Sequence, residues 1–174
     1  TLTSQENFLG LPDHLSALQK ANSCIWPLPY EATTSYVRGT RFGPAAILAA
    51  SHQVEYYDEE LDFEPCSQGV ATLEAWEARD KKHSENLKAL ERAAMDVLAM
   101  QKFVVSLGGE HSIAIPLVRA AATIHPELSV LQLDAHSDLR DAYKGSKENH
   151  ACVMARVNEI CPSVAVGIRS GIAG

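Results

Sequence analysis

Several features are scarce in this sequence, and each scarcity excludes a class of protein. No apolar run approaches the roughly 20 residues that a membrane-spanning helix needs. Lys and Arg number 15 against 22 Asp and Glu, and a net charge of −7 argues against nucleic acid or an anionic membrane as the main partner. The four cysteines show no Cys-x-x-Cys spacing, which favours reduced thiols over a disulfide framework or a zinc–thiolate site. We therefore expect a cytoplasmic protein that binds neither nucleic acid nor membrane.

The two ends of the sequence also lack expected features. The start, TLTSQENFLG, has no initiator Met and no basic segment followed by an apolar stretch, so we expect no secretory signal. The end, VAVGIRSGIAG, stops directly after a strand-like run, although parallel sheets normally have both faces covered. We expect residues 1–174 to form a single domain that is truncated on its C-terminal side.

The apolar pattern of the second half alternates between strands and helices. Apolar residues at helical spacing predict a helix at 85–100. Short apolar runs predict strands at 102–107, 128–134 and 163–168, with helices between them. This order implies parallel βαβ units, and therefore an α/β fold with a mainly parallel sheet.

The first half of the sequence is less regular. The run CIWPLP predicts a strand at 24–29. A helix is expected over GPAAILAASHQV, with Pro44 at its first position. Residues 58–78 are acidic and carry no clear pattern.

Potential metal ligands gather at two predicted strand ends. His111 follows one strand, and Asp134, His136 and Asp138 follow the next at every second position. In extended backbone these three would share one face, and ligands of open α/β sheets bind at the carboxyl ends of strands. Nitrogen and oxygen donors without sulfur favour manganese or a similar divalent ion over structural zinc. Spacing alone leaves one alternative, which is two polar loops with ordinary surface residues.

Four neighbours of these candidate ligands have expected structural roles. Ser112 is a candidate cap for the following helix. Glu110 is a candidate orienting partner for a metal-bound histidine. Arg140 and Asp141 are expected to order the next loop through a salt bridge.

The segments GGEHS (108–112) and DAHSDLRD (134–141) together resemble the metal-binding signatures of the ureohydrolases, the family of arginase and agmatinase. The stretches PLPYEATTSYVRGTRFGPAAILAAS and SKENHACVMARV are similar to the agmatinase branch. The resemblance runs from about Pro27 to Gly174. It implies a three-layer α/β/α, arginase-like fold and a homo-oligomer, either a trimer or a hexamer.

The resemblance also implies roles for five residues. His111 and Asp138 would hold one manganese ion, His136 would hold a second, and Asp134 would bridge both. Two such ions acidify a shared water, which attacks the guanidinium carbon of the substrate. His150 occupies the place of the family's active-site histidine and would relay protons or contact the substrate. The family's two later aspartate ligands, from an Asp-x-Asp motif, are absent from this sequence, so we expect the 174-residue piece alone to be inactive.

The function implied by the resemblance is manganese-dependent hydrolysis of a small cationic guanidino compound. The segment HACVMARV favours agmatine, which would give putrescine and urea in polyamine metabolism. Arginine and guanidinobutyrate are alternative substrates. A non-catalytic fragment that binds metal or serves as an interaction module is the alternative from another class.

Overall fold

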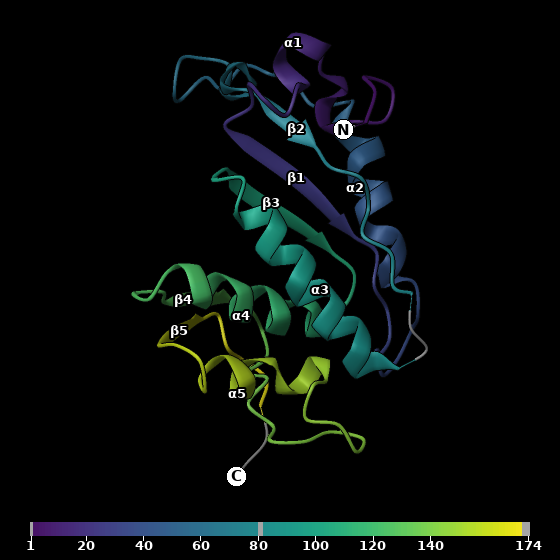
Figure 1. Ribbon diagram of the computed structural model, residues 1–174, viewed down its shortest axis with the longest axis vertical. Coiled ribbons are helices and arrows are strands. Elements are labelled where there is room, and N and C mark those ends of the chain that lie inside the picture. The colour runs from purple at the N-terminus through teal and green to yellow at the C-terminus, as the bar shows by residue number, and fades with distance from the viewer. Residues whose placement is uncertain (1, 80–81, 172–174) are drawn as a thin grey trace. The chain divides into compact units, whose positions relative to one another are not determined.

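The computed structural model describes residues 2–79 and 82–171 of the chain (Figure 1). The chain forms two compact units. The first comprises Thr1–Glu31, Gly39–Glu77 and Met100–Gly109, and the second comprises Ala32–Arg38, Ala78–Ala99 and Glu110–Gly174. The single domain expected over residues 1–174 stays a prediction. Within the described ranges, no helix is both long enough and apolar enough to cross a membrane.

The first unit contains a three-stranded parallel sheet in the order β2-β1-β3 (Figure 1). The central strand β1 (Ser23–Leu28) pairs with β2 (Val70–Thr72) and, along its whole length, with β3 (Phe103–Gly108). Every residue of β1 after the first is buried, as expected for a central parallel strand with both faces covered. The sequence pattern predicted β1 and β3 but missed β2, which has only three residues and lies within the unassigned acidic segment 58–78.

The first unit also contains two α-helices. The short α1 (Asp13–Ser16) lies near the N-terminus. The longer α2 (Gly43–Ser51) contacts β1 and β3, and Pro44 is its second residue, one place after the predicted first position. A proline is tolerated there because the first N–H groups of a helix have no partner within the helix.

The strand β3 ends at a close approach of two backbone segments. A Cβ atom built on Gly109 would collide with the backbone N and O of Tyr30. The N–H of Gly109 donates to the carbonyl of Leu28 at 3.3 Å, which ties the turn to the end of β1. Glycine is therefore required at position 109, because any side chain would push these segments apart.

The described part of the second unit contains a two-stranded parallel sheet and three α-helices. The strand β4 (Val130–Leu133) pairs in register with β5 (Ser163–Val166). The helix α3 (His83–Leu98) packs on α4 (Ala114–Ile124), which in turn contacts α5 (Val153–Val157). The fold is thus mixed α/β with parallel pairing, as predicted. The strands β3 and β4, which the sequence pattern placed next to each other, belong to different sheets.

The two faces of the β4–β5 sheet differ sharply. Val130 packs against a buried cluster that consists of Ile115, Val153, Met154 and Val157. The opposite face is apolar but exposed, with side chains between 52% and 74% accessible. We call it the apolar face, and it consists of Leu131, Leu133, Val164 and Val166.

Candidate metal centre

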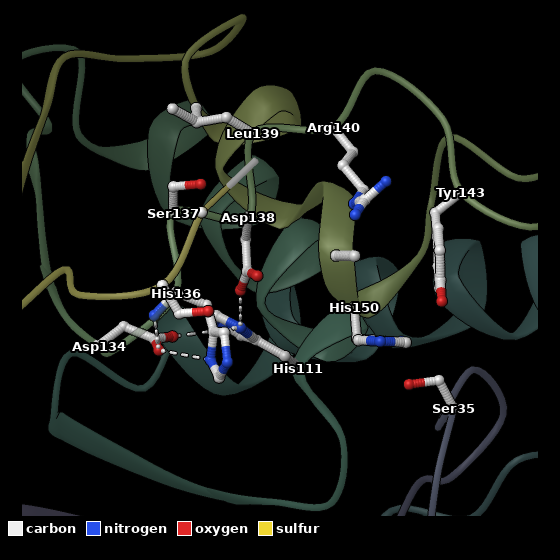
Figure 2. A pocket seen from close by; sticks show the side chains of 13 residues that line it. Ser35, His111, Asp134, His136, Ser137, Asp138, Leu139, Arg140, Tyr143 and His150 are labelled. Atoms are coloured by element: carbon white, nitrogen blue, oxygen red, sulfur yellow. Dashed lines mark hydrogen bonds and ion pairs between the residues drawn. The ribbon is translucent and has the colours of Figure 1, made fainter. Parts of the chain in front are cut away.

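A cavity of about 460 Å³ in the second unit collects the residues predicted to bind metal and substrate (Figure 2). Figure 2 shows the candidate ligands grouped on one side of this cavity and His150 on the other. All five predicted site residues line it, namely His111, Asp134, His136, Asp138 and His150.

Three of the four candidate ligands converge on one point. Nδ1 of His111 lies 2.9 Å from Oδ2 of Asp138 and 3.9 Å from Oδ2 of Asp134. One potential ligand atom from each of the three residues lies within 4.8 Å of the other two. One imidazole and two carboxylates are therefore close enough together to contact a single divalent ion.

The fourth candidate, His136, forms an ion pair or hydrogen bond with only one of the other three described candidates. Its Nδ1 lies 3.6 Å from Oδ1 of Asp134, and its backbone N–H donates to the same oxygen at 2.8 Å. The His136 side chain is 65% exposed and lies outside the three-residue cluster. Asp134 thus stands between His111 and His136, the position that a bridging ligand would need.

The convergence of the two aspartates does not come from a continued strand, as the alternating pattern predicted. The strand β4 ends at Leu133, and Asp138 has a left-handed backbone with φ of +49°. The carbonyl of Asp138 accepts hydrogen bonds from the N–H groups of Met154 at 3.1 Å and Ala155 at 3.3 Å. The first turn of α5 therefore fixes Asp138 in a conformation that is strained for most residues but tolerated by aspartate.

The charges of the cluster favour a cation between the carboxylates. The hydrogen bond to Asp138 raises the pKa of His111, and this effect outweighs burial, which lowers it. Burial alone would raise the pKa of Asp134, but the backbone N–H of His136, the Gln132 side chain and the two histidines together lower it. The carboxylates thus attract a proton to His111, and a bound metal ion would displace that proton.

Glu110, next to His111, forms a separate hydrogen-bond network around its buried carboxylate. Glu110 is only 4% exposed. Oε1 accepts from the backbone N–H groups of Ala32 and Thr33 and from the hydroxyl of Ser112. Oε2 accepts from the Thr33 hydroxyl at 2.9 Å and from the Ser112 N–H at 2.9 Å.

This network corrects two sequence-based expectations. Glu110 rather than Ser112 caps the turn that begins at His111, because the Ser112 hydroxyl is buried and donates to Glu110. The hydrogen bonds of Glu110 go to Ala32, Thr33 and Ser112 instead of to the imidazole of His111. Asp138 is the carboxylate that contacts that imidazole.

His150 is held in place by Thr33, a residue that the sequence did not single out. The Thr33 hydroxyl oxygen accepts from the His150 backbone N–H at 3.0 Å and lies 3.2 Å from its Nδ1. The ring of Tyr143 meets the His150 ring edge-on, with 5.8 Å between the centroids. Thr33 is 117 positions away in the sequence and belongs to no ligand-like pattern, so no local signal could have identified it.

Residues 21–174 match the Arginase family. This chain belongs to the arginase family. It is 44% identical over 154 residues to the N(1)-aminopropylagmatine ureohydrolase of Synechocystis sp., covering 84% of the chain and 50% of that protein. It is 35% identical over 161 residues to the agmatinase of Pyrococcus horikoshii, and this match covers 88% of the chain and 54% of that protein.

The arginase-family relationship extends to solved structures. The agmatine ureohydrolase of Thermoplasma volcanium superposes with a TM-score of 0.81 and 30% identity, over 92% of this chain and 54% of that protein. The chain spans about half the length of the relatives that it matches. Membership of the family implies a divalent metal, and the donor set of His111, Asp134 and Asp138 fits one because it combines imidazole nitrogen with carboxylate oxygen.

In this arginase-family chain, a residue of α5 holds the loop that follows the candidate ligands through hydrogen bonds. Arg156, which is 5% exposed, donates to the carbonyl of Asp141 at 3.2 Å and to its carboxylate at 2.9 Å. Lys147 pairs with the same carboxylate at 3.1 Å. The partners of Asp141 are therefore Arg156 and Lys147, whereas the predicted partner Arg140 lies over the ring of Tyr143 at 5.0 Å.

Proposed function

We propose that the complete protein containing this chain is a manganese-dependent ureohydrolase that converts agmatine to putrescine and urea. The observation that carries this proposal is the convergence of His111, Asp134 and Asp138 in a cavity that His150 also lines. The names of the agmatinase relatives support the choice of substrate. The complete protein is further proposed to be a cytoplasmic homo-oligomer, a trimer or hexamer, of polyamine metabolism.

Two metal positions are proposed within the site. His111 and Asp138 would hold one manganese ion, His136 would hold the other, and Asp134 would contact both. When bound, such a pair of ions lowers the pKa of water enough to supply a nucleophile near neutral pH. The carboxylates of Asp134 and Asp138 also favour the approach of a cationic guanidinium group by simple charge attraction.

His150 is proposed as the residue that transfers a proton to the departing amine. Its imidazole lines the same cavity as the candidate ligands, and Thr33 holds its backbone and Nδ1. The amine product of guanidine hydrolysis needs a proton in order to leave, and an imidazole that has first taken up a proton can supply it close to neutral pH.

A second candidate substrate is N(1)-aminopropylagmatine, because the 44% identical relative from Synechocystis carries that name. Arginine and guanidinobutyrate are weaker candidates within the same reaction class. A metal-binding or interaction module without catalytic activity is the rival function. For residues 1–174 alone we propose no useful activity, since Asp134 is the one described candidate ligand with which His136 forms an ion pair or hydrogen bond.

Urea release from the full-length protein tests this proposal. The assay uses agmatine, N(1)-aminopropylagmatine, arginine and guanidinobutyrate, each with and without added manganese. Urea from agmatine, dependent on manganese and abolished by His150→Asn, is the expected result. No urea from any compound would eliminate the enzymatic function, whereas urea from a different compound alone would change only the substrate. Residues 1–174 should bind fewer than two manganese ions per chain in calorimetry and release no urea.

A further inference from the structure

We propose that Thr33 is a positioning residue that fixes the tautomer of His150, so that Nδ1 carries the proton and Nε2 carries the lone pair. This inference rests on the proposed proton-transfer role of His150, which depends on which ring nitrogen is free. It follows from the hydrogen bonds of one hydroxyl group, whose partners are Glu110 on one side and His150 on the other.

The direction of the hydrogen bond between Thr33 and Glu110 is determined by the donors around the carboxylate. An ionised carboxylate only accepts hydrogen bonds. Glu110 accepts five, two from the hydroxyls of Thr33 and Ser112 and three from the backbone N–H groups of Ala32, Thr33 and Ser112. The single proton of the Thr33 hydroxyl therefore points to Oε2 of Glu110, 2.9 Å away.

The same oxygen then has only lone pairs left for His150. A hydroxyl offers one proton and two acceptor positions. The backbone N–H of His150 occupies one position at 3.0 Å, and Nδ1 lies 3.2 Å from the oxygen. Because the hydroxyl has no second proton to give, Nδ1 must be the donor in this contact. The neutral imidazole thus carries its proton on Nδ1.

This arrangement leaves Nε2 as the basic nitrogen of His150. Within residues 2–79 and 82–171, Nε2 has no hydrogen-bonding partner, and the ring lines the cavity that contains the candidate ligands. In an unrestrained neutral imidazole the two tautomers interconvert. The hydrogen bond to Thr33 selects one of them, so that the nitrogen left free for proton transfer is always the same one.

Nitrogen NMR of the histidine rings tests the tautomer without any enzymatic activity. The chain is labelled with ¹⁵N-histidine, freed of metal and measured at about pH 8, where an ordinary imidazole is neutral. His150→Asn identifies the signals of His150. Thr33→Val removes the hydroxyl while keeping the shape, and Thr33→Ser restores it. Ser112→Ala is the matched control, because it removes the other hydroxyl on Glu110 and does not touch His150.

The expected result is a protonated Nδ1 in the wild type, in Thr33→Ser and in Ser112→Ala. Thr33→Val should shift His150 towards the Nε2–H form that free imidazole side chains prefer. An Nε2–H tautomer in the wild type would overturn the inference, as would an unchanged tautomer in Thr33→Val. If Thr33→Val does not fold, the wild type and Thr33→Ser decide the question.

A kinetic measurement on the full-length protein separates this inference from the proposed function. Thr33→Val should lower kcat about tenfold to a hundredfold and leave KM within about threefold, since only part of the gain from acid–base catalysis is lost. Thr33→Ser should recover most of kcat. If the full-length protein releases no urea, the proposed function fails, but the NMR result still decides the tautomer. If urea is released and the tautomer is wrong, only this inference fails.

Discussion

Glu110 and His111 are neighbours in the chain, but they belong to regions of opposite character. The carboxylate of Glu110 is buried and accepts five hydrogen bonds, so its charge is fully compensated by the protein. The carboxylates around His111 are partly exposed, crowd one imidazole and lie close to each other. A compensated polar group stabilises a fold, whereas converging groups with unused acceptor positions are suited to bind a ligand.

The largest expected effect concerns the stability that Glu110 provides. Glu110→Ala should lower the free energy of unfolding of the metal-free chain by about 3 kcal/mol, because five donors lose their acceptor and those of Ser112 are fully buried. Asp138→Asn should change it by less than about 1 kcal/mol, because that carboxylate has little compensation to lose. Urea denaturation of both variants measures the difference. Equal losses would show that the two regions do not differ in the way that their hydrogen bonds indicate.

Metal binding should depend on the partly exposed cluster around His111, whose residues are expected to contribute little to stability. Asp134→Asn should weaken manganese binding in the full-length protein by on the order of a hundredfold. Loss of a residue that only orients a metal ligand already weakens metal binding by about tenfold to a hundredfold, and loss of a ligand should cost at least as much. Ser137→Ala changes a residue that lines the same cavity without belonging to the ligand cluster, and it should leave the metal content unchanged. Elemental analysis after dialysis measures both. Similar metal loss in the two variants would contradict the assignment of Asp134 as a ligand.

The apolar face of the β4–β5 sheet is a further region whose side chains lack partners within the described residues. Exposed apolar patches promote association, so residues 1–174 should self-associate at high concentration. Replacing Leu131 and Leu133 by Lys should reduce that association with little change in stability. Val54→Lys, at an exposed apolar position in the first unit, is the control. Light scattering compares the three proteins, and equal association in all of them would exclude the apolar face as its cause.

The smallest expected effect is the pH dependence of the loop anchor at Asp141. The hydrogen bond from Arg156, with help from Lys147, lowers the pKa of Asp141 in the folded state. Because the pKa of Asp141 is lower in the folded state, its ionised carboxylate stabilises the fold when the pH is above about 3.9, the pKa in the unfolded chain. This stabilisation is lost as the pH falls through the pKa of the folded state. The denaturation midpoint of Asp141→Asn should therefore lie slightly below that of the wild type at about pH 6. The gap should close in strong acid, and a gap that stays constant would contradict the charge-based account.

Much of the framework could be predicted from the sequence because its signals are local. The spacing of Leu87, Leu90 and Val97 indicated α3, and short apolar runs indicated β3, β4 and β5. The rule that ligands gather at strand ends pointed to His111, Asp134 and Asp138, although β3 and β4 belong to different sheets.

The remaining features depend on contacts between distant residues or on single backbone angles. Thr33 meets His150 only after the chain folds, so spacing contains no trace of the pair. The left-handed backbone of Asp138 depends on hydrogen bonds from α5, and the alternating pattern concealed it behind an apparent strand. The three residues of β2 were too few to give a periodic signal.

The two hydrogen bonds to the carbonyl of Asp138 connect the metal centre to the local unfolding of α5. A helix of five residues has little stability of its own and opens often. An ion that holds the side chain of Asp138 would also steady its carbonyl, and this would slow hydrogen–deuterium exchange at the N–H groups of Met154 and Ala155. Occupancy of the centre would then be readable from the exchange rates of two amides that never touch the metal.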